Sequence, residues 1–134
     1  MTMRISNPID ISVSGLRAEA LRMKVISNNI ANANTTRTES GEPYRRHEVV
    51  LRATEDALSG VEVDQILADM AGKFKTMYQP GHPDANSDGF VQMPNVQLPV
   101  EMMTLVAAGR AYQANAAVMK KYQEMVNFTI ELLK

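Results

Sequence analysis

Apolar residues recur along the N-terminal third of the chain at alternating steps of three and four positions. The members of this repeat are Ile9, Val13, Leu16, Ala20, Met23, Ser27 and Ile30. Such spacing places its members on one face of a helix, as in the seam of a coiled coil. Asn7 followed by Pro8 is a typical helix start. In the Asn-rich run 32–36, short polar side chains compete for backbone hydrogen bonds and end the pattern. The pattern predicts a helix within residues 1–35.

The C-terminal third carries the same repeat over a longer stretch. Its members are Met102, Leu105, Gly109, Tyr112, Ala116, Met119, Gln123, Val126, Ile130 and Leu133. Pro99 and Glu101 suit the first turn of a helix. A helix over 99–134 would be about 50 Å long at a rise of 1.5 Å per residue. A compact chain of 134 residues is only about 28 Å across, so we expect an elongated molecule.

The segment between these helices, residues 36–98, is rich in turns and short strands. Val49 and Leu51 stand two positions apart, as do Val61 and Val63, which is the spacing of strand residues on one face. Glycines and prolines recur through the rest of the segment and favour turns. The predicted fold is mainly α with a small β-rich middle. Its N- and C-terminal helices are expected to pair as a coiled coil.

The predicted helices carry apolar residues beside their seams as well as in them. These flanking residues are Val25, Ile26, Met103, Val106, Val118, Tyr122, Met125 and Leu132. The apolar face is therefore wider than two paired helices bury, and such surface is typical of contacts with other chains. Two alternatives stay open: the middle segment folds back over part of the face, or the chain is a compact helical bundle. The residues expected to form an assembly interface are Val13, Leu16, Ala20, Met23, Ile30, Leu105, Tyr112, Met119, Val126, Ile130 and Leu133.

Composition excludes several classes of protein. The formal net charge is −1, whereas nucleic-acid-binding domains usually carry a strong basic excess. No apolar run approaches the roughly 20 residues that span a bilayer, so no direct membrane insertion is expected. The first ten residues do not have the pattern of a cleaved signal peptide. Composition alone thus favours a cytoplasmic protein. The chain has no cysteine, which excludes disulfides and thiolate chemistry.

Candidate chemistry along the chain is weak. Residues 84–89 match the opening of a calcium-binding loop, but the twelfth position, which should be a bidentate Glu, is Asn95. A polar turn before a strand is the better interpretation. His47 and His82 have no second histidine at metal-binding spacing. No catalytic or nucleotide-binding motif is present, so we predict no enzyme activity, no metal and no cofactor.

Three stretches together resemble a known family, the axial proteins of the bacterial flagellum (rod, hook and hook-associated proteins). They are residues 14–35, residues 78–96, and residues 101–115 with the repeat that follows them. The first and third are similar to signatures found across that family. The second, with the short length of the chain, is similar to proximal-rod members, since distal-rod and hook proteins have larger central domains. One departure is Gly109 before Arg110, where relatives often have Ser.

The resemblance implies a structural subunit of the proximal rod that assembles with itself and other rod proteins through its terminal helices, around the export channel. It implies passage through the flagellar type III export apparatus without a cleaved signal, a place in the periplasmic rod, and contact with the membrane-ring junction. This replaces the cytoplasmic expectation. The alternative, from another class, is a small cytoplasmic helical adaptor or metal-binding bundle protein.

Overall fold

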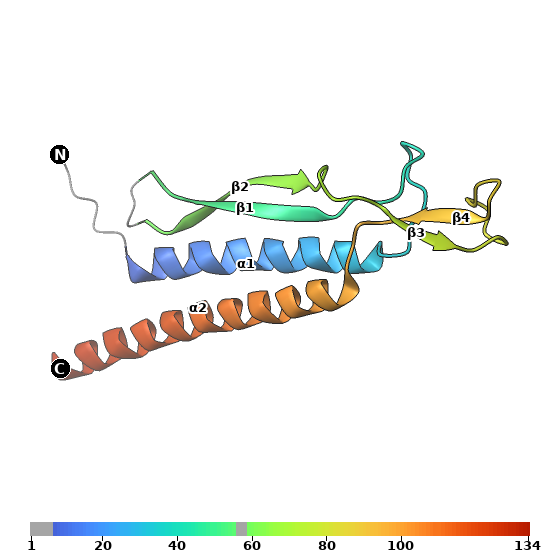
Figure 1. Cartoon of the computed structure of the whole chain (residues 1–134). Coiled ribbons are helices and arrows are strands. Elements are labelled where there is room, and N and C mark those ends of the chain that lie inside the picture. The colour runs from blue at the N-terminus through green and yellow to red at the C-terminus, as the bar shows by residue number, and fades with distance from the viewer. Residues whose placement is uncertain (1–6, 56–58) are drawn as a thin grey trace.

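The computed structural model describes residues 7–55 and 59–134, so the first six residues of the predicted N-terminal segment lie outside it. The elements in chain order are α1 (Pro8–Ala31), β1 (His47–Ala53), β2 (Val61–Ala68), β3 (Lys75–Tyr78), β4 (Phe90–Met93) and α2 (Leu98–Leu132). Figure 1 shows α1 and α2 side by side, running in opposite directions along the length of the molecule. The prediction of two terminal helices around a small β-rich middle is confirmed.

The start of α1 follows the sequence pattern. The Asn7 side chain accepts a hydrogen bond from the Ile9 N–H at 3.1 Å, and Pro8 occupies the first helical turn. The helix ends at Ala31, where the side chain of Asn32 donates to the Asn28 carbonyl at 2.9 Å. The Asn-rich run therefore ends the helix, as predicted, by supplying a side-chain donor to one of its last carbonyls.

The strands form two separate hairpins. Strands β1 and β2 pair antiparallel with a register shift between Val50 and Leu51, and β3 pairs antiparallel with β4. The first pair agrees with the predicted strands. In the second pair, β4 is the strand predicted after the polar turn, whereas β3 was missed. Tyr78 and Phe90 face each other across β3 and β4, with ring centroids 5.3 Å apart in an edge-to-face arrangement.

The middle segment covers α1 and leaves α2 open. Among the elements described, β1 and β2 contact α1, whereas α2 contacts α1 alone. Ser14 on α1 anchors the hairpin, since its Oγ accepts a hydrogen bond from the Val61 N–H at 3.1 Å. The alternative in which the middle folds back over the helices therefore applies to α1. Helix α2 has one face on α1, and its other sides are left to solvent (Figure 1).

The molecule has the large surface of an elongated shape. Its accessible area is 9792 Å², whereas a compact monomer of 14.8 kDa would expose about 7,000 Å². The predicted elongation is confirmed. Few apolar side chains are buried, and those in the described residues are Ala18, Val25, Ile26, Tyr44, Val49, Val91, Val96 and Ala108. Neither helix in the described part of the chain is apolar enough over its length to cross a membrane.

Gly89 is required by the turn that connects β3 to β4. Its φ is +82°, and an added Cβ would lie 2.9 Å from Cε2 of Tyr78. We expect Gly89→Ala to lower the free energy of unfolding by about 1–3 kcal/mol, measured by chemical denaturation. Gly81→Ala is the matched control, because no atom lies within 4 Å of its Cβ position. Equal losses at Gly81 and Gly89 would contradict this account of the turn.

Candidate functional site: an exposed helix surface and a buried polar junction

The residues predicted to form the assembly interface are all at least partly exposed in the single subunit. Val13, Leu16, Met23, Ile30, Leu105 and Met119 are partly buried, and Ala20, Tyr112, Val126, Ile130 and Leu133 are exposed. The exposed fraction reaches 51% at Ile130 and 83% at Leu133. Packing within the subunit therefore leaves all of these residues accessible.

Several of the residues that the helices do bury lie one position away from the predicted seam. On α1, Ser12, Glu19 and Ile26 are buried at intervals of seven, and on α2 Glu101 and Ala108 are buried at the same interval. Gly15 on α1 lies so close to the Asn115 side chain on α2 that an added Cβ at Gly15 would lie 2.8 Å from it. Small and polar residues therefore occupy this face of α1 and let α2 approach it.

A buried amide and a buried carboxylate meet at the junction of α1, β1 and α2. Asn29 and Glu101 are both 0% exposed, and Nδ2 of Asn29 donates to Oε2 of Glu101 at 3.2 Å. The same Nδ2 donates to the His47 carbonyl at 2.8 Å, while Oδ1 of Asn29 accepts from the His47 N–H and the Tyr44 hydroxyl, both at 2.9 Å. Every hydrogen-bonding position of the Asn29 amide is therefore occupied.

Arg46 supplies the cation for the buried carboxylate. Its Nε donates to Oε1 of Glu101 at 2.5 Å, and its Nη1 pairs with Glu48 at 3.3 Å. Partial burial alone would lower the pKa of the Arg46 guanidinium, but the hydrogen bond and charge of Glu101 outweigh it, so that pKa is raised above its ordinary value. The side chain of Asn95 fixes the backbone of Arg46, because Oδ1 of Asn95 accepts a hydrogen bond from the Arg46 N–H at 2.8 Å.

Tyr44 extends the network to the surface of α1. Its hydroxyl accepts from Asn28 Nδ2 at 3.2 Å and lies 3.0 Å from Nδ1 of His47. Burial raises the pKa of the Tyr44 hydroxyl, the Asn28 hydrogen bond opposes that rise, and the charge of Glu101 adds to it. The phenol is thus kept neutral, which preserves the proton that it donates to Asn29.

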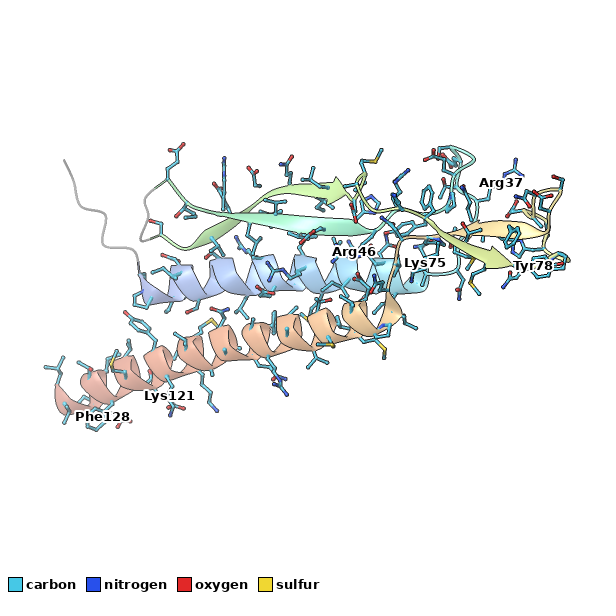
Figure 2. The ribbon with its side chains drawn as sticks, in the orientation of Figure 1. Arg37, Arg46, Lys75, Tyr78, Lys121 and Phe128 are labelled. Atoms are coloured by element: carbon cyan, nitrogen blue, oxygen red, sulfur yellow. The ribbon has the colours of Figure 1, made fainter. Side chains whose placement is uncertain are left out.

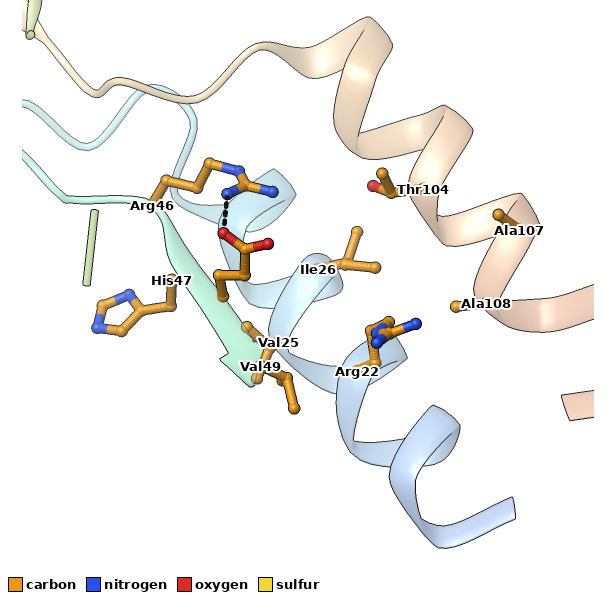
Figure 3. A pocket seen from close by; sticks show the side chains of 10 residues that line it. Arg22, Val25, Ile26, Arg46, His47, Val49, Thr104, Ala107 and Ala108 are labelled. Atoms are coloured by element: carbon orange, nitrogen blue, oxygen red, sulfur yellow. Dashed lines mark hydrogen bonds and ion pairs between the residues drawn. The ribbon is translucent and has the colours of Figure 1, made fainter. Parts of the chain in front are cut away.

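An open groove of about 360 Å³ adjoins this junction between β1 and the two helices. Figure 3 shows Ile26 on α1 and Ala108 on α2 along its sides, with the Arg46–Glu48 ion pair at its edge. The groove contains no arrangement of nucleophile, base and oxyanion donors. The polar junction beside the groove holds three chain segments together, which is a structural role.

The calcium-like stretch has its candidate ligands engaged elsewhere. Asp84 accepts a hydrogen bond from the Thr36 hydroxyl at 2.7 Å and pairs with Arg37 at 3.6 Å. Oδ1 of Asn86 accepts from the N–H groups of Asp88 and Phe90. Across residues 7–55 and 59–134, His, Asp and Glu side chains form no cluster of three that could hold a metal ion. The stretch is a polar turn joining β3 to β4.

Sequence reasoning missed Asn29 and Glu101 as members of one cluster. Glu101 was interpreted as an acidic residue in the first turn of a helix and as part of a family signature, and Asn29 as part of a family signature. One signal was available: an amide and a carboxylate stand next to the apolar repeat, at positions 29 and 101. Their pairing across 72 residues of sequence is visible only in the fold.

Comparison with known proteins identifies the family. The model "Flagella basal body rod protein" matches residues 9–37, and "Flagellar basal body rod FlgEFG protein C-terminal" matches residues 87–132. The flagellar basal-body rod protein FlgC of Agrobacterium fabrum is 40% identical to the chain, with 92% of this chain and 91% of that protein covered. The chain belongs to the FlgC family of flagellar basal-body rod proteins. The FlgC proteins of Salmonella typhimurium (37% identical, 97% of this chain and 98% of that protein covered) and Bacillus subtilis (36%, 98% and 100%) show the same similarity.

The family match confirms the resemblance found in the sequence. The chain is a structural subunit of the flagellar basal-body rod and not an enzyme, and membership in this family implies assembly with other rod components. The match gives no support to the alternative of a cytoplasmic adaptor or metal-binding bundle. The matched ranges cover all of α2 and nearly all of α1, the elements that the buried junction ties together.

The surface of α2 is consistent with a subunit made for assembly. The helix has 35 residues, of which only Glu101 and Ala108 are buried. It is about three turns longer than α1, which has 24 residues, and its C-terminal end runs past the start of α1 (Figure 1). Its exposed large apolar side chains are Leu98, Val100, Met102, Met103, Val106, Tyr112, Val118, Met125, Val126, Phe128, Ile130 and Leu132.

Proposed function

We propose that the chain is a subunit of the proximal rod that assembles with copies of itself and with other rod proteins through its terminal helices, around the export channel. The apolar surface of α2 carries this proposal. Within residues 7–55 and 59–134 nothing covers that surface, and large apolar side chains such as Phe128, 61% exposed, gain up to about 1.5–3 kcal/mol each on burial. Figure 2 shows Phe128 on the side of α2 turned away from α1.

The eleven residues predicted from the apolar repeat form the contact surface in this proposal. Their seven-residue spacing suits coiled-coil packing with neighbouring chains. Packing inside the subunit leaves all eleven at least partly exposed, although Met23 also lies close to Gly109 of α2. We assign residues 1–35 and 99–134 to the core domain of the assembled rod and residues 36–98 to its outer part. The exposed hairpin of β3 and β4, at the end of the molecule away from the tip of α2 (Figure 1), belongs to that outer part.

We also infer how the subunit reaches the rod and where it assembles. The subunit leaves the cytoplasm through the flagellar type III export apparatus without a cleaved signal peptide and joins the rod in the periplasm, next to the membrane-ring junction. The similarity to FlgC proteins along the whole chain supports this route.

Deletion of the gene tests the assignment. We expect cells without it to be non-motile and to lack rods in isolated basal bodies viewed by electron microscopy, because one missing layer of subunits prevents the next from adding. Expression of the full chain from a plasmid is the control and should restore both rods and swimming. Complete rods in the deletion strain would contradict the proposal.

A further inference from the structure

The buried cluster of Asn29, Glu101 and Arg46 joins three separate parts of the chain. Asn29 lies near the end of α1, Arg46 just before β1, and Glu101 in the first turn of α2. Both carboxylate oxygens of Glu101 accept hydrogen bonds, one from Arg46 and one from Asn29. Figure 2 places Arg46 where the hairpin and the two helices come together.

Net stability is a poor explanation for this cluster. Desolvation of a buried ion pair cancels most of its Coulomb attraction, and apolar residues of similar volume are often as stable in its place. What the cluster adds is discrimination, because any alignment that separates the partners leaves a charge buried and unpaired. A buried polar residue that fixes the register of paired helices is the best-attested use of such a group.

The helices need such discrimination because their packing is otherwise permissive. Buried positions repeat every seven residues on both helices, at Ser12, Glu19 and Ile26 on α1 and at Glu101 and Ala108 on α2, so a slide of one heptad, about 10.5 Å, would still place buried positions against one another. A slide in one direction brings Ala108 opposite Asn29, and the Ala108 side chain cannot accept its hydrogen bond. A slide in the other direction places Asn29 beyond the start of α2 at Leu98. Either slide also removes Glu101 from Arg46.

We propose that the Asn29–Glu101–Arg46 cluster is a register lock, which selects one alignment of α1, β1 and α2. These are positioning residues. They fix where along the molecule the exposed apolar residues of α2 stand. The register lock is a property of the single subunit. Its use in positioning contacts between rod subunits rests on the proposed function.

Disulfide trapping in the purified full-length subunit tests the lock, because the chain has no cysteine of its own. A Cβ at Gly109 would lie 4.0 Å from Sδ of Met23, so the pair Met23→Cys with Gly109→Cys reports the alignment seen here. Met23→Cys combined with Met102→Cys or with Ala116→Cys reports a slide of one heptad in either direction. With the cluster intact, only the first pair should form a disulfide under mild oxidation.

Arg46→Met with Glu101→Met removes the charges while keeping the volume. We expect the helical circular dichroism to be preserved and the ratio of slid to native cross-links to rise at least tenfold. The matched control is Arg52→Met with Glu62→Met, which removes an exposed ion pair of 2.7 Å between β1 and β2 and should leave the ratio unchanged. An unchanged ratio in the cluster variant would overturn the proposal.

A second variant keeps the test decisive where the double variant does not fold. Glu101→Gln preserves the shape of the side chain but offers one acceptor to two donors, Arg46 and Asn29. We expect slid cross-links to rise at least threefold in this variant. Cross-links confined to the native pair would count against the lock. Because these measurements use the free subunit, they are independent of rod assembly, which the deletion experiment tests.

Discussion

Replacing Ile130 by aspartate is expected to abolish rod assembly and swimming while leaving the subunit folded. Ile130 is 51% exposed and lies in the last turns of α2, so the carboxylate stays hydrated in the free protein. Burial of an unpaired charge against a neighbouring subunit costs about 3–5 kcal/mol, which weakens that contact more than a hundredfold. Swimming assays and electron microscopy of basal bodies measure the loss.

The control for this experiment is Gln113→Asp, an exposed polar position on the same helix. It adds the same charge outside the apolar repeat and should permit swimming. Circular dichroism of the purified Ile130→Asp subunit should match that of the parent protein. Normal swimming with Ile130→Asp would show that this end of the repeat is not part of the interface.

Replacing Arg46 by methionine is expected to produce the largest loss of stability in the subunit. It leaves Glu101 fully buried without its cation, and breaking a buried pair on one side costs about 3–5 kcal/mol. The double change Arg46→Met with Glu101→Met should recover most of this loss, because no charge then remains buried. The free energy of unfolding from chemical denaturation measures each variant.

The comparison for Arg46→Met is Arg52→Met. The side chains of Arg52 and Glu62 are 60% and 42% exposed, so that pair should contribute no more than about 1 kcal/mol. A loss at Arg46 as small as the loss at Arg52 would show that Glu101 tolerates burial without its partner, and would remove the physical basis of the junction.

The helices were predictable because local rules decide them. Asn7 and Pro8 define the start of α1 through side-chain capping and a fixed φ, and the apolar repeats extend through both helices. The strands of the first hairpin followed from the two-residue spacing of their apolar residues. In the second hairpin β4 was predicted as the strand after a polar turn. Strand β3 was not, because both strands have only four residues and their pairing depends on contacts such as Tyr78 with Phe90.

Part of the face on which the helices pack was not predictable from hydrophobicity, although Met23 and Gly109 of the two predicted repeats lie close together. The apolar repeat through Val13 and Ala20 marks a face that the subunit leaves partly or fully exposed. The face packed on α2 includes Gly15, which permits close approach, and Glu19, which pairs with Arg22 at 3.1 Å. Apolar periodicity does not mark Gly15 or Glu19 as packing residues. Small residues such as Gly15 nevertheless allow helices to approach closely.

The buried junction could not be derived from the sequence because its energy depends on simultaneous contacts. Asn29, Arg46 and Glu101 are each ordinary surface residues by composition. They become tolerable in the interior only when all three meet, since each one alone would be an unsatisfied polar group. Because the three residues are tolerated in the interior only together, the cluster favours the one alignment of α1, β1 and α2 in which they meet.

Protection of single cysteines in isolated basal bodies tests the central claim most directly. Ile130→Cys and Met125→Cys place thiols on the apolar surface of α2, and Ser40→Cys places one on an exposed turn of the middle segment. Met125 and Ile130 should react with a maleimide in the free subunit and be protected at least tenfold in basal bodies, while Ser40 reacts in both. Equal labelling of Met125 and Ile130 in the two preparations would contradict an assembly surface on α2.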